Sequence, residues 1–195
     1  MSRLERPAPA AGDPSAEAQR RAAAVRLLVL DVDGVLTDGR LYFGADGESL
    51  KVFDVRDGLG VKLLREAGVE VAILSSRSSP IVERRARELG IGQVIQGASD
   101  KGAAFATLAG SLALPLDTCA FLGDDWPDIA ALSQAGFAAA VADAAPEVRR
   151  CAHWTSTAPG GRGAVRELAE FILRAQGRHD GLLARHGGRA ADGHA

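Results

Sequence analysis

The chain has 195 residues, which is enough for one domain with a hydrophobic core. Apolar residues make up 47% and charged residues 25%, and the net charge of -2 shows no basic excess that would indicate a nucleic-acid partner. No apolar run is long enough to span a membrane, and residues 1–24 carry no hydrophobic block of a secretory signal. Cys119 and Cys151 lack metal-ligand spacing, so we expect reduced thiols and a cytoplasmic protein.

Composition divides the chain into three segments. Residues 1–24 are rich in Ala, Pro and Arg without periodicity, which predicts a disordered N-terminal arm, with a short helix over Glu17–Ala24 as the alternative. Residues 178–195 are rich in Gly, His and Arg and are predicted to form a flexible C-terminal tail. Residues 25–177 are predicted to fold as one domain.

The pattern along residues 25–177 is typical of an α/β fold. Short apolar runs bounded by Gly, Asp or Ser predict buried parallel strands, and the stretches between them predict helices. We therefore expect a doubly wound, mainly parallel sheet of the Rossmann-like kind. The predicted strands are Arg26–Leu30, Glu70–Leu74, Gln93–Gln96, Thr118–Leu122 and Phe137–Val141. The predicted helices are Gly58–Ala67, Pro80–Leu89, Lys101–Leu112, Asp128–Ala135, Glu147–Cys151 and Gly163–Gln176.

One segment interrupts this alternation directly after the first strand. Arg40–Phe43, an Asp-Gly turn within residues 44–47, and Leu50–Phe53 predict a β-hairpin. A hairpin of this length is too short to cover a site, so we expect no large cap domain. Its apolar side chains would either form a contact between subunits or pack on their own sheet. The residues concerned are Leu41, Tyr42, Phe43 and Phe53.

Two aspartates follow the first strand, at the edge of the sheet where open parallel sheets bind their ligands. A carboxylate such as Asp31, placed directly after an apolar strand, is partly desolvated and needs a cation or hydrogen bonds. Asp33 lies two residues further on, so both side chains would face the same side of a continuing strand. The alternative is that the two aspartates only cap the turn that follows.

The next two strands also end in polar residues. Ser75 offers a hydroxyl donor, and Arg77 a guanidinium that suits phosphate or carboxylate; the alternative is a helix N-cap. Lys101 begins a helix, where a cation is unfavourable unless it pairs with an anion. The alternative for Lys101 is a solvated surface side chain.

The fourth strand leads into three acidic residues, Asp124, Asp125 and Asp128. Their carboxylates would repel one another, and a divalent cation would relieve this repulsion. Mg²⁺ prefers hard oxygen ligands and commonly takes a couple of carboxylates together with waters and phosphate oxygens. Helix capping would explain Asp125 or Asp128, but not all three acids.

These motifs, in this order, resemble those of the haloacid dehalogenase-like phosphatases. Within that superfamily, the stretches DVDGVLTDGRLYF, VRDGLGVKLL, GDDWPD and APGGRGAVRE resemble the phosphatases that act on 3-deoxy-D-manno-octulosonate 8-phosphate, over about Val25 to Gln176. The resemblance implies a hydrolase that removes this phosphate in lipopolysaccharide biosynthesis with magnesium (Mg2+) as cofactor. It also implies a cytoplasmic homotetramer that acts on a small phosphorylated acidic sugar, without a nucleic-acid or membrane partner.

The resemblance implies a role for each matching residue. Asp31 resembles the nucleophile that becomes an aspartyl phosphate, and Asp33 resembles the general acid and base. Ser75 and Lys101 resemble the residues that bind the transferring phosphate. The implied metal ligands are Asp31, Asp124 and the backbone carbonyl of Asp33. The implied substrate-contacting residues are Asp33, Asp54, Val55, Arg56, Asp57, Gly58, Lys62, Arg77, Arg85 and Lys101.

Two residues depart from the family pattern, and three alternatives stay open. Ser76 replaces a glycine, and Asp54 stands where Asn or His is common, so a nine-carbon nonulosonate 9-phosphate is an alternative substrate. A catalytically silent scaffold is a second alternative, which the intact acidic and lysine positions argue against. A receiver-type signalling domain is the third. The hairpin and Asp33 argue against it, because a stable phospho-signal avoids a built-in hydrolytic base.

Overall fold

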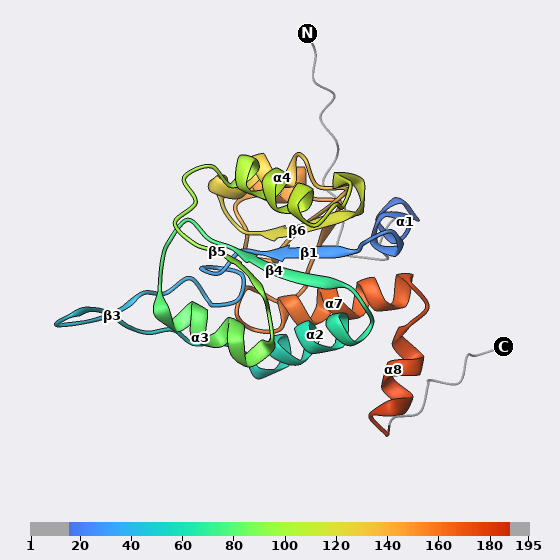
Figure 1. The fold of residues 1–195 in the computed structure, drawn as a ribbon, viewed down its shortest axis with the longest axis horizontal. Coiled ribbons are helices and arrows are strands. Elements are labelled where there is room, and N and C mark those ends of the chain that lie inside the picture. The colour runs from blue at the N-terminus through green and yellow to red at the C-terminus, as the bar shows by residue number, and fades with distance from the viewer. Residues whose placement is uncertain (1–15, 188–195) are drawn as a thin grey trace, which may run out of the picture.

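The computed structural model describes residues 16–187, and a six-stranded parallel sheet forms its centre (Figure 1). The predicted α/β fold with a mainly parallel sheet is confirmed. Residues 1–15 of the expected N-terminal arm and residues 188–195 of the expected tail lie outside the described residues. From one edge to the other, the strands are β5 (Gln93–Ile95), β4 (Glu70–Leu74), β1 (Leu27–Leu30), β6 (Cys119–Gly123), β7 (Phe137–Ala140) and β8 (Trp154–Thr155).

The central strand β1 explains where a site can form. Leu30, its last residue, is paired in register with Ile73 of β4 and Leu122 of β6. The chain continues from β1 to β4 on one side and returns to β6 on the other, so the winding direction reverses at β1. A ligand site is expected at the carboxyl ends of strands beside such a reversal.

Helices cover both faces of the sheet, with α4 on one face and α2, α3 and α7 on the other (Figure 1). Helix α3 begins with Pro80 and ends at Gly90 in the left-handed region at φ 72°, as its sequence predicts. The helices that complete the two layers are α2 (Val55–Glu66), α3 (Pro80–Leu89), α4 (Lys101–Ser111), α5 (Ile129–Leu132), α6 (Pro146–Cys151) and α7 (Ala164–Ala175). None of the helices within residues 16–187 is long and apolar enough to cross a membrane.

Three elements form where the sequence predicts none or only an alternative. Helix α1 (Ala16–Ala23) buries two alanines one turn apart and packs against α7, although its segment reads as a disordered arm. Helix α8 (His179–Arg185) buries Leu182 within the expected flexible tail. Strand β8 has two residues, too few for a periodic signal. In each case tertiary packing, rather than local sequence, stabilises the element.

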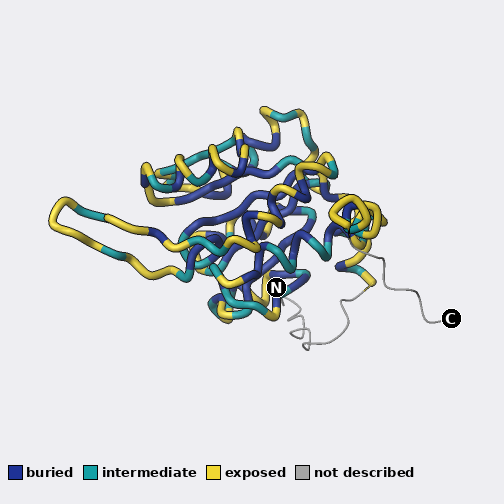
Figure 2. The backbone as a smooth tube through the Cα atoms, turned by 90° about the horizontal axis from the view of Figure 1, so that it is seen from below, coloured by how far each residue is buried: buried dark blue, intermediate teal, exposed yellow. Residues whose placement is uncertain are grey.

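The predicted hairpin is present, but its second strand lies earlier than expected. Strands β2 (Tyr42–Gly44) and β3 (Gly47–Leu50) pair antiparallel as a separate two-stranded sheet. Gly44 pairs with Gly47, so the connection is only two residues long, and the strand predicted over Leu50–Phe53 is wrong except at its first residue. The hairpin projects from the domain and is mostly exposed (Figure 2).

Candidate active site

The centre of the candidate site is Asp31, which follows β1 directly. It is only 6% exposed, as expected for a carboxylate at the end of a strand buried on both faces. Its compensating cation is Lys101, whose Nζ lies 2.7 Å from Asp31 Oδ1. Two elements that are distant in sequence thus bring together the first aspartate of the DxD motif and the lysine that begins α4.

Lys101 is also buried, and it bridges two carboxylates. Its Nζ donates to Asp128 Oδ1 at 2.6 Å as well as contacting Asp31. Burial alone would lower the pKa of Lys101, but the charges and hydrogen bonds of Asp31 and Asp128 outweigh it and raise the pKa above its ordinary value. The side chain therefore stays a charged donor at the carboxyl end of the sheet.

The loop after β6 is held by its own aspartates. Asp128 Oδ2 accepts the backbone N–H groups of Asp124 at 2.9 Å and Asp125 at 3.3 Å, while Asp125 caps Trp126. Together with its contact to Lys101, Asp128 uses both carboxylate oxygens inside the protein. Capping thus explains Asp125 and Asp128, and it leaves Asp124 as the acid of this loop without a capping role.

Within residues 16–187, Asp31, Asp124 and Asp128 have carboxylate oxygens within 4.8 Å of one another. Burial, together with the charge of Asp128, raises the pKa of Asp31 to about 6 despite the opposing effect of Lys101. Burial and the charges of Asp31 and Asp128 raise the pKa of Asp124 to about 8. One lysine is not enough to neutralise three crowded carboxylates, so this donor set fits an additional hard cation such as Mg²⁺.

A glycine after the DxD motif makes room for this cluster. Gly34 adopts φ 98°, a left-handed conformation that favours glycine, and a Cβ atom there would overlap the Asp124 carboxylate. The turn after β1 therefore approaches the loop after β6 as closely as a backbone without a side chain allows.

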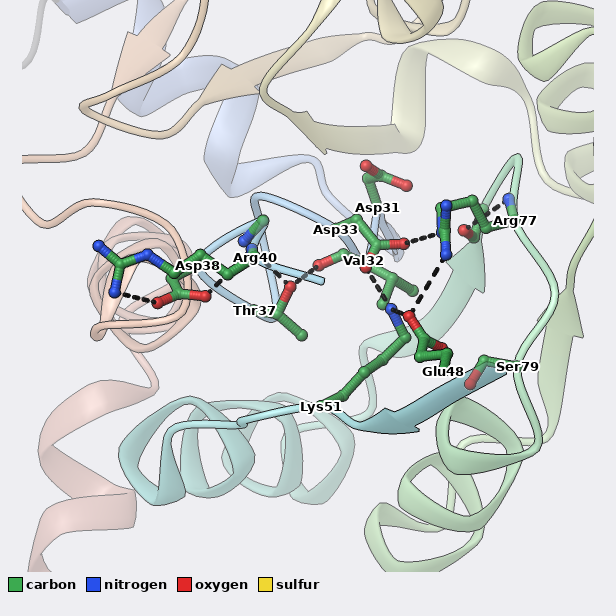
Figure 3. Close-up of polar contacts among 12 residues, drawn as sticks. Asp31, Val32, Asp33, Thr37, Asp38, Arg40, Glu48, Lys51, Arg77 and Ser79 are labelled. Atoms are coloured by element: carbon green, nitrogen blue, oxygen red, sulfur yellow. Dashed lines mark hydrogen bonds and ion pairs between the residues drawn. The ribbon is translucent and has the colours of Figure 1, made fainter. Parts of the chain in front are cut away.

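Asp33 belongs to a second charged network on the hairpin side of the site (Figure 3). Lys51 Nζ donates to Asp33 Oδ1 and lies 2.9 Å from Glu48 Oε1. Arg77 approaches both acids, with its Nε 3.6 Å from Asp33 Oδ2 and its Nη2 3.4 Å from Glu48 Oε1. The side chains of Asp31 and Asp33 thus enter two different networks.

The predicted contacts on α2 have mixed placements. Asp54 is the N-cap of α2, accepting the Arg56 backbone N–H at 2.7 Å and the Arg56 guanidinium at 2.8 Å. Asp57 is buried, and its two oxygens accept the backbone N–H groups of Gly163 and Arg166 at the start of α7. Burial raises the pKa of Asp57, although these hydrogen bonds oppose the rise. The structure therefore gives Asp57 a capping function.

The other predicted contacts come from α2, α3 and the end of β4. Gly58 lies against Arg85, whose guanidinium is 5.6 Å from the centre of the Phe53 ring. Lys62 and Val55 are exposed on α2. Ser75, after β4, is buried, and its Oγ accepts the backbone N–H of Arg77 at 3.2 Å. The structure thus groups Asp31, Lys101 and Asp124 tightly, and arranges the predicted sugar contacts along the neighbouring helices.

Sequence reasoning missed two members of the Asp33 network, Glu48 and Lys51. Both belong to the hairpin region, where apolar residues alternate with polar ones and a charged side chain reads as solvent-facing. A signal was nevertheless present, because Lys51 comes three residues after Glu48 and a lysine with a nearby acid can pair. The burial of Lys51 could not be read from that spacing.

The comparisons with known proteins agree on one group of enzymes. A family model described as haloacid dehalogenase-like hydrolase matches residues 54–136. The 3-deoxy-D-manno-octulosonate 8-phosphate phosphatase of Yersinia pestis is 44% identical over 162 residues, which are 83% of this chain and 87% of that protein.

Two solved structures extend this similarity to the fold. The crystal structure of a 3-deoxy-D-manno-octulosonate 8-phosphate phosphatase from Moraxella catarrhalis, in complex with magnesium, phosphate and KDO, has a TM-score of 0.86 and 41% identity, covering 88% of this chain and 99% of that chain. The cobalt-bound phosphatase of the same description from Haemophilus influenzae has a TM-score of 0.81 and 41% identity, covering 82% and 94%.

Proposed function

Since the chain belongs to the 3-deoxy-D-manno-octulosonate 8-phosphate phosphatases, a family of haloacid dehalogenase-like hydrolases, we propose that it removes the phosphate of 3-deoxy-D-manno-octulosonate 8-phosphate. The reaction is the hydrolysis of a phosphoric monoester, and it takes place in lipopolysaccharide biosynthesis in the cytoplasm. One observation carries the proposal: Asp31 and its charged partner Lys101 are buried at the carboxyl end of the sheet, beside the half-buried Asp124.

The first half of the reaction uses Asp31 as nucleophile. A carboxylate needs no deprotonation near neutral pH, so an Asp31 oxygen can attack phosphorus in line with the leaving oxygen. Lys101 and the hydroxyl of Ser75 donate hydrogen bonds to the equatorial phosphate oxygens. The bond to the sugar oxygen breaks, and Asp33 supplies the proton that this oxygen takes up.

The second half regenerates the enzyme. A water molecule attacks the phosphorus of the aspartyl phosphate and gives its proton to Asp33, which lost one in the first half. The bond between phosphorus and the Asp31 oxygen then breaks, releasing inorganic phosphate and the Asp31 carboxylate. Asp33 thus acts first as acid and then as base, so its position controls both halves.

Mg²⁺ would be held by Asp31, Asp124 and the backbone carbonyl of Asp33, because Asp128 already uses both of its oxygens within the protein. When bound, it supplies positive charge that offsets the repulsion between the carboxylates and the substrate phosphate. The other charges for the substrate come from Arg77, Arg85, Lys62 and Arg56, which we propose contact its carboxylate and hydroxyl groups along with Asp54, Val55 and Gly58.

We further propose that the chain assembles as a homotetramer through the β2–β3 hairpin. Phe43 is 65% exposed and Leu41 is 42% exposed, so these side chains do not pack on their own sheet. Phe53 differs, since it is partly buried against the domain core. Light scattering tests the assembly, with a tetramer expected and a fully active monomer as the contradicting result.

A substrate comparison tests the proposed reaction. Phosphate release is measured with Mg²⁺ on 3-deoxy-D-manno-octulosonate 8-phosphate, on a nine-carbon nonulosonate 9-phosphate and on a panel of hexose phosphates. We expect the eight-carbon substrate to give the highest kcat/KM. Faster turnover of the nine-carbon substrate would keep the chemistry and change the substrate, in line with the Asp54 and Ser76 departures. No release from any ester would overturn the proposal.

A further inference from the structure

The network around Asp33 contains a lysine whose burial needs an explanation. The side chain of Lys51 is only 1% exposed, and it lies just after β3 at the base of the hairpin. A buried ammonium is strongly unfavourable unless it is paired and hydrogen-bonded. Both of the carboxylates that compensate it, Asp33 and Glu48, come from the site or the hairpin.

We propose that Lys51 is a positioning residue for the reaction: it holds the carboxylate of Asp33 in place for proton transfer, and Glu48 of the hairpin holds Lys51. The proposal rests on the proposed function, in which Asp33 is the acid and then the base. Lys51 itself has no contact with the reacting atoms in this scheme, because Asp33 and Glu48 enclose its ammonium.

The exposed fractions of the side chains indicate that Lys51 holds Asp33 from the interior of the protein. Lys51 is buried, whereas the Asp33 side chain keeps 16% of its surface and the Arg77 side chain 43%. The Asp33 carboxylate therefore has a buried cation on Oδ1 and a more open cation near Oδ2. This leaves the open side for substrate and fixes the rotation of the carboxylate from the interior (Figure 3).

Glu48 stabilises the buried ammonium of Lys51. Burial would raise the pKa of Glu48, but the hydrogen bond from Lys51 and the charges of Lys51 and Arg77 hold the pKa below its usual range. Glu48 is thus an anion on strand β3, paired with the same ammonium as Asp33. The pair with Glu48 is local, because the two residues lie three apart in the hairpin, whereas the pair with Asp33 joins Lys51 to the turn after β1.

The choice of leaving group can distinguish a misplaced Asp33 carboxylate from a general loss of folded structure. A sugar alkoxide needs a proton from Asp33 to leave, but 4-nitrophenolate is stable enough to leave without one. Transfer of phosphate from 4-nitrophenyl phosphate to Asp31 therefore bypasses Asp33, while the later hydrolysis of the aspartyl phosphate still needs Asp33 to accept a proton from water. A misplaced Asp33 slows the second step and spares the first.

The test is rapid-mixing kinetics of Lys51→Met with 4-nitrophenyl phosphate and Mg²⁺, with Lys51→Arg as the conservative variant. Arg185→Met is the matched control, since it removes a paired cation from an exposed contact with Glu66. Complete loss of general acid-base catalysis typically lowers rates by about 10²–10⁴-fold. For a misplaced group we expect steady turnover to fall by about 10–100-fold, with the first release of nitrophenolate within about threefold of wild type.

The other variants sharpen this result. Lys51→Arg should regain most of the steady rate, because it restores a donor to Asp33, and Arg185→Met should match wild type in both phases. Turnover of the eight-carbon sugar phosphate by Lys51→Met should fall in its first turnover too, because that leaving group requires the proton. If Lys51→Met does not fold, Glu48→Gln decides: it should lower steady turnover by a smaller factor and again spare the first release.

Two outcomes would overturn the proposal. Equal loss in both phases would mean that Lys51 only stabilises the fold, and unchanged steady turnover would mean that Asp33 needs no holding. Both outcomes require an active wild-type enzyme. An inactive wild type would instead count against the proposed function itself, so the two failures are distinguishable.

Discussion

Two charged networks meet at the candidate site, and their charge balances differ. The network around Asp31 holds three carboxylates and one lysine, so its formal charge is negative. The network around Asp33 holds two carboxylates, Asp33 and Glu48, and two cations, Lys51 and Arg77, so it is neutral in the half of the cycle in which Asp33 is ionised.

The Asp31 network therefore carries negative charge that a bound cation can offset, whereas the charges of the Asp33 network are balanced by protein groups. Carboxylates in the first network have raised pKa values, because their crowding is not compensated within the chain. A divalent metal ion would offset this excess negative charge and allow a phosphate ester to approach. The second network is satisfied by protein groups alone, which suits the task of holding one carboxylate still.

The largest effect is expected from removing the only lysine of the first network. Lys101→Met should lower kcat by about 10²–10³-fold, as is typical for losing a donor that stabilises developing charge. It should also destabilise the fold by about 3–5 kcal/mol, because Asp31 and Asp128 lose their buried cation. Steady-state kinetics and urea unfolding measure the two effects. A variant with normal kcat would contradict the assigned role of Lys101.

Asp124→Asn tests whether the first network is a metal site. Activity should fall by more than the roughly 10–100-fold that is usual for residues supporting a metal ligand. Without divalent cations, however, the variant should have a higher Tm than wild type at pH 7.5, since one of three crowded carboxylates is gone. Thermal unfolding in the presence of a chelator measures this expected rise in Tm. A Tm below that of wild type would contradict the repulsion between the carboxylates.

A pH series tests the same repulsion in the unmutated protein. The folded-state pKa is about 8 for Asp124 and about 6 for Asp31, both above the ordinary value of 3.8. The folded protein therefore binds more protons than the unfolded chain, and stability from these groups falls as pH rises from about 4 to about 8. The gain in Tm on adding Mg²⁺ should be larger at pH 8.5 than at pH 5.5. An equal gain at both pH values would be the contradicting result.

The smallest effect is expected outside both networks, at Asp57. This carboxylate caps α7 with backbone N–H groups and has neither a metal nor a cation in its hydrogen bonds. Asp57→Ala should lower the free energy of unfolding by about 1–2 kcal/mol, the range for a lost cap. The kcat/KM of the folded protein should fall by less than about tenfold. A far larger loss in kcat/KM would indicate that Asp57 contacts the substrate directly.

The order of the chain predicts the first network better than the second. Asp31 and Asp124 follow apolar strands, and Lys101 begins a helix where a cation needs an anion, so local rules indicate each of them. Lys51 follows a strand whose pairing is shifted relative to its apolar pattern, and its burial depends on the turn after β1. The contact between Lys51 and Asp33 joins the hairpin to the turn after β1, and no pattern within either segment predicts it.

The fold shows the same division. Buried strands such as β4 and helices with clear ends such as α3 have the bounds that their sequences predict. Helix α1 forms because two alanines fit against α7, and small side chains give no apolar periodicity to detect. The family resemblance singles out Asp57 as a substrate contact. Its capping of α7 was not predictable, because the contact joins residues more than a hundred positions apart.

Trapping the covalent intermediate tests the central claim, that Asp31 is the nucleophile, most directly. Wild type is mixed with the eight-carbon sugar phosphate and Mg²⁺, quenched in acid during turnover, and digested for mass spectrometry, beside Asp31→Asn. We predict a phosphoryl group on the peptide that contains Asp31, located at that residue, and none in Asp31→Asn. Rapid phosphate release by Asp31→Asn, or a phosphoryl group on a different residue, would contradict the account.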